Sequence, residues 1–383
     1  QFLNDIKNEL SEIDLKIGLK YLFINYEVNN ASDIVKQYLA LKLKKSFFSN
    51  TARFHDLIES ILIFYGRGKP VAFPLPTVWL EILNKNEIKT NSFVSAIYWI
   101  QFILLNYLKG CYYILQTIIT FFDWRYNYPY NKKLTKTISF DSLNECQFPS
   151  KNNSLSHDIF TWFNNYKKTN SNLVHNNSSF KHISYNSNIK YNHYFIPPLT
   201  SFSIFAKFLV WSAYIVTYSF IQLLLNKWWY PLLLMEIVKV KRFELQKGNK
   251  FISEEYYFYS EWVYRPIWTY YLEEKLGKNI FFYFYSTNSQ GFKTNNGYKP
   301  HDFDWRLISW PVYLVWNNYQ KEFIQKYAKR EPKFLTCGPV YFQSKIDELP
   351  SFPNNFKTIV NNRKDTTFNP CFYCAYYLVG KSR

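Results

Sequence analysis

The sequence predicts an α/β protein, because strand-like and helix-like segments alternate along its C-terminal part. The strand-like segments are short runs rich in aromatic and branched residues, at 256–259, 280–285, 312–316, 333–337 and 357–360. The run at 280–285 is apolar at every position, which is typical of a strand buried on both faces of a parallel sheet. Alternation five strands deep predicts a doubly wound parallel sheet over about residues 236–383.

Helix signals lie between these strands. A first helix is expected from Arg265 and Pro266 to about Leu276, because Pro suits the first turn and Gly277 suits the stop. A second is expected at 318–329, where Asn317 and Gln320 have the spacing of a capping box. A third, at 371–379, follows the last strand. The sheet is expected to be incomplete where the sequence stops, which predicts a fragment.

The N-terminal part has weaker signals. Residues 1–50 have the apolar spacing of an amphipathic helix, and the turn-rich stretch at 66–70 lacks the spacing of a phosphate-binding P-loop. Residues 145–195 are rich in Asn, Ser and His, so a solvated loop is expected there. His175 lies in this stretch, and the alternative is that one of its histidines lines a substrate cleft.

Two apolar stretches raise the question of a membrane. Residues 93–122 are interrupted by Gln101, Asn106 and Lys109, whereas residues 208–225 carry no formal charge. Eighteen residues just reach the length of a spanning helix, since roughly 20 are needed. A spanning helix and a buried or interfacial helix both remain open for residues 208–225, and the lysines and tryptophans at 207 and 227–229 suit an interface.

Length and composition limit the remaining possibilities. A chain of 383 residues suits two domains, here 1–235 and 236–383. The net charge of +18 favours an anionic partner, but an A/T-rich genome would also enrich Lys and Asn, and no nucleic-acid-binding motif is present. The five cysteines are scattered and form no disulfide framework. No signal peptide is visible at the start of the sequence.

The candidate site follows from the predicted sheet. Ligands of open parallel sheets bind beyond the carboxyl ends of the strands, where hydroxyls, amides, glycines and helix N-termini suit phosphate or sugar. The polar segments predicted at these ends are 286–288, 316–318, 338–339 and 361–364. Asp302 and Asp304 have the Asp-x-Asp spacing of a divalent-metal site. The alternative is that both lie in a solvated loop and bind no metal.

Several aromatic motifs carry a resemblance to a known family. They are Tyr-Arg-Pro-Ile-Trp-Thr-Tyr at 264–270, Phe-Tyr-Phe-Tyr-Ser-Thr-Asn at 282–288, Trp-Pro-Val-Tyr-Leu-Val-Trp at 310–316, Glu-Phe-Ile at 322–324 and Cys-Gly-Pro-Val-Tyr-Phe at 337–342. With them the chain resembles bacterial surface-polysaccharide biosynthesis proteins of the PFTS-motif type. It is also similar to the C-terminal domain of GT-B glycosyltransferases. The resemblance implies two Rossmann-like domains, with the acceptor side in 1–235 and the nucleotide-sugar donor side in 236–383.

The resemblance also implies site residues. The donor side would be lined by Arg265, Ser286, Thr287, Asn288, Trp316, Gln320, Gly338 and Pro339. Arg363 is a further candidate for binding the donor, because its positive charge after the last predicted strand suits a leaving diphosphate, although the family pattern departs at 361–363. No resident cofactor or obligatory metal is implied, which argues against the metal role of Asp302 and Asp304. If the reaction inverts, a general base is needed, and His55, His175 and Glu236 are the candidates.

The resulting expectation is a glycosyltransferase of surface or capsular polysaccharide biosynthesis. It would move a sugar from a nucleotide-activated donor to a glycan or lipid-linked acceptor, in the cytoplasm or peripherally attached to the inner face of the membrane. Nucleic acid is not an expected partner. The alternative is a non-catalytic, membrane-associated protein of an A/T-rich or organellar genome.

Overall fold

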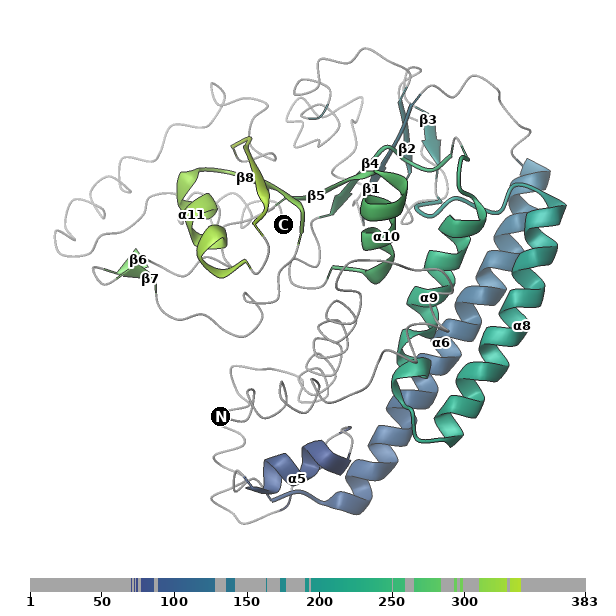
Figure 1. The fold of residues 1–383 in the computed structure, drawn as a ribbon, viewed down its shortest axis with the longest axis vertical. Helices are drawn as coiled ribbons and strands as arrows, with labels where there is room; N and C mark the ends of the chain where they lie inside the picture. Colours follow the sequence, from purple (N-terminus) through teal and green to yellow (C-terminus); the bar gives the residue numbers. More distant parts are fainter. Residues whose placement is uncertain are drawn as a thin grey trace, which may run out of the picture.

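The structure is a computed structural model of the 383-residue chain (Figure 1). It describes most of residues 77–127 and 194–283, together with 310–328 and 331–338. It also describes 136–141 and a few shorter segments, at positions 70, 72, 74, 163, 173–176, 190–192, 293–294 and 297–298. The predicted elements at 1–50, 357–360 and 371–379 lie outside the described residues.

A seven-stranded sheet forms the centre of the fold. Its strands are β1 (Lys136–Phe140), β2 (Leu173–Asn176), β3 (Lys190–Asn192), β4 (Glu255–Phe258), β5 (Asn279–Tyr283), β8 (Val312–Val315) and β9 (Lys333–Thr336). The spatial order is β3-β2-β1-β4-β5-β8-β9, and every neighbouring pair is parallel. A separate two-stranded antiparallel pair joins β6 (Lys293–Thr294) and β7 (Gly297–Tyr298). The α/β prediction is confirmed.

The C-terminal strands and helices form where the sequence predicted them. β4 and β5 flank α10 (Ile267–Leu276), and β8 and β9 flank α11 (Asn318–Tyr327). Gly277 ends α10 in the left-handed conformation, at φ 62°, where a side chain would be strained. The four strands and two helices in this part therefore confirm the predicted βαβ units, with their ends shifted by one or two residues.

The N-terminal strands were not predicted. β2 and β3 lie in the Asn-, Ser- and His-rich stretch that was expected to be a solvated loop, so that expectation is wrong at 173–176 and 190–192. Both strands, with β1, belong to the same sheet as β4 to β9. The predicted boundary after residue 235 falls inside α9 (Trp229–Leu245). The described residues contain one large parallel sheet rather than two Rossmann-like sheets.

Both faces of the sheet are packed with aromatic side chains. On one face α9, α10 and α11 cover the strands, and Phe243 of α9 stacks on Trp268 of α10 at 5.2 Å between ring centroids. On the other face, Tyr257 of β4 stacks between Phe140 of β1 and Phe281 of β5, at 4.9 and 4.7 Å. Such cross-strand aromatic contacts stabilise a sheet beyond the burial of area alone. The strand interior is therefore a two-sided core, as expected for a parallel sheet.

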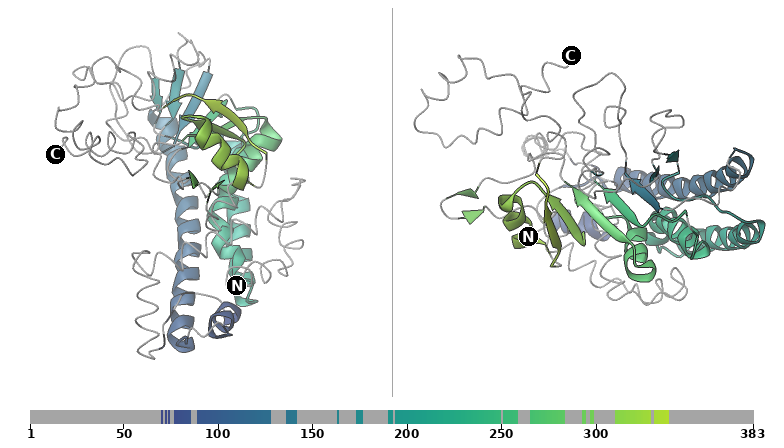
Figure 2. Two further views of the ribbon diagram at one scale, coloured as in Figure 1. Left: turned by 90° about the vertical axis from the view of Figure 1, so that its left-hand side faces the viewer. Right: turned by 90° about the horizontal axis from the view of Figure 1, so that it is seen from above.

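Three helices form a bundle that extends away from the sheet (Figures 1 and 2). They are α6 (Ser92–Asn127), α8 (Phe202–Leu224) and α9, with the short α5 (Thr77–Lys85) at the far end. α8 begins where the Ser201 hydroxyl accepts a hydrogen bond from the Ile204 amide at 3.2 Å. Gly110 lets α6 approach α9 closely, since a Cβ there would lie 2.6 Å from Cγ of Leu234. α8 and α9 together form the connection from β3 to β4.

The bundle projects beyond the carboxyl ends of the strands. The carboxylate of Glu236, near the middle of α9, reaches the first turn of α10, which follows the carboxyl end of β4. The last residues of α9 lead instead to the amino end of β4. The first half of α9 therefore lies beyond the carboxyl edge, as does the part of α6 around Trp99, whose ring meets Trp228 at 5.5 Å.

Candidate functional site

The strand order places a topological switch point between β1 and β4. Counted along the chain, the sheet reads 3-2-1-4-5-6-7, which is the common dinucleotide-binding order with one strand added. After β1 the chain continues to β2 and β3, toward one edge of the sheet, and after β4 it continues to β5, β8 and β9, toward the other edge. The two connections therefore diverge at the carboxyl ends of β1 and β4. Ligands of open α/β sheets bind in the crevice that this divergence leaves.

Asp141 lies at this switch point, directly after β1. It is half-buried, and its amide donates to the carbonyl of Tyr257 in β4 at 2.8 Å. Its negative charge also acts on Lys239 of α9 and helps to raise the pKa of that ammonium group. The sequence prediction missed Asp141, because residues 136–140 were not expected to form a strand. The signal was the position of a carboxylate at the end of a short β-branched and aromatic run.

The turn between β8 and α11 is the best-defined polar feature of the carboxyl edge. The Asn317 side chain caps α11 by accepting from the Gln320 amide at 3.0 Å. The Gln320 side chain accepts from the Trp316 amide at 2.7 Å, one residue earlier than in a capping box. Trp316 and Gln320, both predicted donor-side residues, are thus brought together by a direct hydrogen bond.

The side-chain NH2 group of Gln320 is a hydrogen-bond donor that could bind a ligand. The residue is 1% exposed, and within the described part of the chain its Nε2 has no hydrogen-bond partner. A buried amide donor without a partner is costly, so such groups often mark a ligand or ordered water. The N-terminus of α11 adds partial positive charge at the same place. The arrangement suits an anionic or hydroxyl-rich ligand.

Cys337 and Gly338 follow β9 at the neighbouring position of the edge. Gly338 has φ 69°, which favours glycine, and the Cys337 amide donates to the Val315 carbonyl at 2.9 Å. Burial raises the pKa of the Cys337 thiol to about 12, so the thiol is neutral at physiological pH. Cys337 is therefore not a ready nucleophile.

Arg265 lies directly before Pro266 and α10, as the sequence predicted, and its side chain makes contacts within the fold. Its side chain is buried, its Nε donates to Thr269 at 2.9 Å, and its guanidinium forms an ion pair with Glu273 at 2.5 Å. The guanidinium also lies 3.7 Å from the ring centroid of Tyr270. These contacts are all internal to α10 and the turn before it. They bind Arg265 into the fold, and a role on the donor side stays a prediction.

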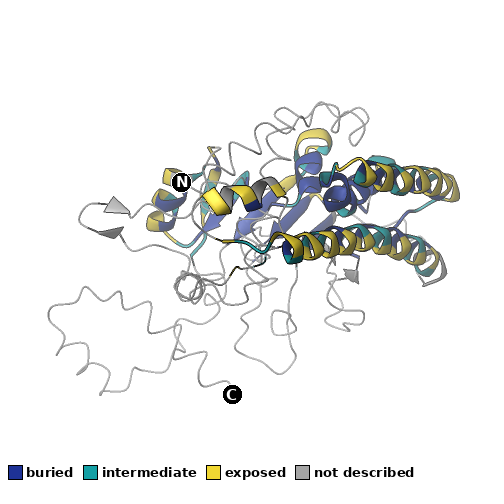
Figure 3. Ribbon diagram, turned by 90° about the horizontal axis from the view of Figure 1, so that it is seen from below, coloured by how far each residue is buried: buried dark blue, intermediate teal, exposed yellow. Residues whose placement is uncertain are grey.

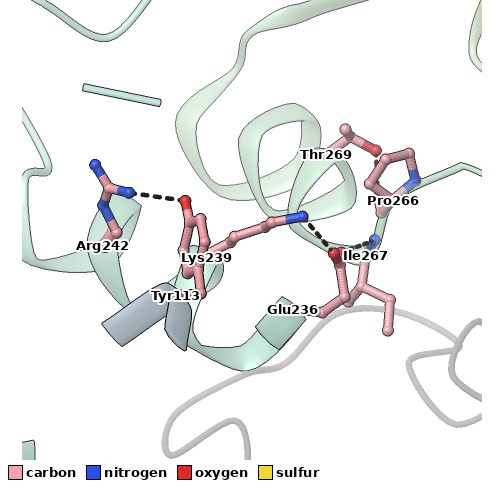
Figure 4. Close-up of polar contacts among 7 residues, drawn as sticks. All are labelled: Tyr113, Glu236, Lys239, Arg242, Pro266, Ile267 and Thr269. Carbon is pink, nitrogen blue, oxygen red and sulfur yellow. Dashed lines mark hydrogen bonds and ion pairs between the residues drawn. The ribbon is translucent and has the colours of Figure 1, made fainter. Parts of the chain in front are cut away.

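Glu236 is likewise bound into the fold (Figure 4). It is 2% exposed, and one oxygen accepts from the Lys239 ammonium at 2.8 Å. The other accepts from the Ile267 amide at 2.9 Å, at the N-terminus of α10, where Pro266 offers no side-chain cap. Burial opposes the charge on Lys239, but Glu236, Tyr113 and Asp141 outweigh it and raise the Lys239 pKa. Glu236 thus ties α9 to α10.

The remaining predicted residues are not placed by the structure. His55, Ser286, Thr287, Asn288, Asp302, Asp304, Pro339 and Arg363 lie outside the described residues. His175 lies in β2, between β1 and β3, but its side chain is not described. Among the described residues, no three His, Cys, Asp or Glu side chains gather as metal ligands would.

Comparison with known proteins supports the family resemblance. Residues 218–365 match the family of polysaccharide biosynthesis PFTS motif proteins. This PFTS-motif segment starts in α8 and includes α9, α10, α11 and strands β4 to β9. It therefore contains the β8–α11 turn and every aromatic motif on which the resemblance rested. No curated protein and no solved structure matches the chain.

Proposed function

We propose that the protein is a glycosyltransferase of surface or capsular polysaccharide biosynthesis. It takes a sugar from a nucleotide-activated donor and passes it to a glycan or lipid-linked acceptor. The family match supports a role in polysaccharide biosynthesis. The observation that carries the transfer reaction is the β8–α11 turn, where a helix N-terminus and the buried Gln320 amide lie at the carboxyl edge of a parallel sheet.

The chemistry of transfer explains why such a turn would serve. The bond between the sugar and the nucleoside diphosphate breaks, and negative charge accumulates on the leaving diphosphate. A helix N-terminus and a preorganised amide donor stabilise that charge without rearrangement. We assign this role to the first turn of α11 and to Gln320, in place of Arg265.

The acceptor hydroxyl needs a base if the configuration at the sugar inverts. Glu236 is a poor candidate, because both of its oxygens have internal partners. Asp141 lies half-buried at the switch point between β1 and β4, which is the position where ligands of such sheets bind. We assign the base to Asp141, with His175 of the neighbouring strand β2 as the second candidate.

The test is isothermal titration calorimetry of the full chain with UDP, GDP, CMP and dTDP. The protein should bind one of them, and Gln320→Leu should weaken that binding about tenfold, as expected for the loss of one hydrogen bond to a charged group. Gln325→Leu is the matched control, because Gln325 lies exposed on the same helix. Absence of binding to every nucleotide, or equal effects of the two variants, would overturn the proposal.

A further inference from the structure

The outer faces of α6 and α8 carry a large apolar surface. Of the described large hydrophobic side chains that are exposed, all but Tyr319 lie on these two helices or at the C-cap of α8. Phe93 is 76% exposed, Val210 75% and Leu224 71%. Figure 3 shows exposed positions running along both helices for most of their length. Water-soluble monomers rarely expose a continuous apolar surface of this extent.

The inner faces of the same helices are more polar than the outer faces. α8 turns Ser212, Ser219 and Gln222 inward, and α6 buries Asn106 and Thr117. Asn106 and Thr117 each donate to the carbonyl four residues earlier, both at 2.8 Å. Gly110 adds a close helix contact. Small and polar residues inside with apolar residues outside is the pattern of helices packed in lipid, and it reverses the pattern of a water-soluble protein.

Length and charge agree with a lipid environment. The uncharged stretch 208–225 of α8 and its C-cap is about 27 Å long, close to the roughly 30 Å of a bilayer core. Both helices are long and apolar enough to cross a membrane, and in each candidate span only 28% of the most apolar window is buried. A core helix of a soluble protein would be mostly buried.

Within the apolar stretch 93–122 of α6 and within α8, the charged side chains are basic. Lys109 is the one charged residue within 93–122, and Lys207 is the one within α8. Both are exposed, and neither stretch contains a carboxylate. Long lysine side chains can extend toward anionic headgroups while their stems stay in the apolar region. A water-soluble protein partner would offer no such match in length and charge together.

We infer that α6 and α8 are inserted in a lipid bilayer, with their outer faces in contact with acyl chains. The protein is then an integral membrane protein, and the carboxyl edge of its sheet is the edge from which the inserted helices project. This inference does not depend on the nucleotide site, so failure of nucleotide binding would leave it unchanged.

Spin labelling in vesicles tests the inference. Single cysteines replace Val210, Phe220 and Leu224 in a chain whose five native cysteines are changed to alanine. The protein is reconstituted into vesicles of phosphatidylethanolamine and phosphatidylglycerol. Collisions with oxygen should exceed collisions with a water-soluble nickel complex at all three sites. Gln325→Cys on α11 should show the reverse, and Ser219→Cys, in the helix interface, should be shielded from both.

Two results would overturn the inference. Dominant nickel collisions at the three outer sites would place this face in water, and low collisions with both reagents would mean that protein covers it. If the cysteine-free chain does not fold, the wild-type chain is labelled in the same vesicles with a lipid-soluble carbene. Peptides from α6 and α8 should then carry the label and those from α11 should not, whereas equal labelling would contradict insertion.

Discussion

Glu236 and Arg265 are buried charged residues whose chemistry suits catalysis but whose contacts stabilise the fold. From the sequence, Glu236 was a candidate general base, and Arg265 was a candidate donor-binding residue at the start of a helix within an aromatic motif. In the structure Glu236 caps α10 and pairs with Lys239, and Arg265 pairs with Glu273. Lys239 is three residues from Glu236, a helical spacing, but the Ile267 amide is 31 residues away and Glu273 is eight residues from Arg265, so local spacing does not show these two contacts.

Replacement of Glu236 distinguishes these roles. Glu236→Ala should lower the free energy of unfolding by about 3 kcal/mol, because it leaves the Lys239 ammonium and the Ile267 amide without their acceptor. Glu236→Gln keeps an acceptor for Ile267 and should cost less. Thermal and chemical unfolding in detergent micelles measure both. Asp141→Asn is the comparison, expected to lower turnover with little loss of stability, and the opposite pattern would restore Glu236 as the base.

The raised pKa of the Cys337 thiol predicts slow alkylation of the folded protein. Its pKa of about 12 in the folded protein lies above the ordinary 8.5 to 9. At pH 8 the thiolate fraction is then roughly a thousandfold smaller than in the unfolded chain, so alkylation by iodoacetamide should slow by about that factor. Peptide mapping by mass spectrometry isolates Cys337 from the other four cysteines.

The same shift affects stability. Above pH 9 the unfolded chain loses this proton while the folded chain keeps it, so the contribution of Cys337 to stability declines as pH rises through 9 to 12. A Cys337→Ser variant should show a smaller decline. A midpoint near pH 8.5 for alkylation of the folded protein would contradict the burial on which this prediction rests.

At the scale of helices and strands, the contact between α6 and α9 depends on one glycine. Gly110→Ala would place a methyl group 2.6 to 2.8 Å from three atoms of Leu234, including its Cβ, so one helix must move. We expect a loss of about 2 kcal/mol in unfolding free energy, typical of an overpacked core. Thermal unfolding in detergent measures it.

A second substitution tests the cause. Leu234→Ala removes two of the three clashing atoms, so the double variant should lose less than the sum of the two single variants. Ala96→Leu, on the exposed side of α6, adds more volume and should be nearly neutral. Strict additivity of Gly110→Ala and Leu234→Ala would mean that the two residues do not meet.

The elements that could be predicted share a physical reason. β5 and β8 are apolar at nearly every position, and α10 and α11 have clear signals in Gly277 and Asn317. β1 has no such pattern, because it includes Thr137 and Ser139, which are nonetheless buried. Ser139 is satisfied by a 2.6 Å hydrogen bond to Ser253, a partner 114 residues away. Local composition cannot show a partner at that distance.

At the scale of the whole molecule, the strand order could not be predicted from the sequence, because it also depends on contacts between segments far apart in the chain. The predicted strands are neighbours in the chain, and β4-β5-β8-β9 are indeed adjacent in the sheet. The pairing of β1 with β4 joins segments separated by the whole α8–α9 connection. The candidate site was therefore half predicted: Trp316 and Gln320 lie at the carboxyl edge, whereas the switch point and Asp141 depend on that long-range pairing.

On the inferred insertion of α6 and α8, the place of α8 within the chain limits how the protein could be released from a membrane. Many peripheral enzymes carry their anchor at one end of the chain, where a protease can remove it and free a working soluble domain. Here α8 and α9 lie inside the chain, between β3 and β4, and the residues on either side pair within one sheet. Cleavage on either side of α8 would divide the sheet itself. With α8 inserted as inferred above, proteolysis beside α8 would therefore not release an intact sheet into solution.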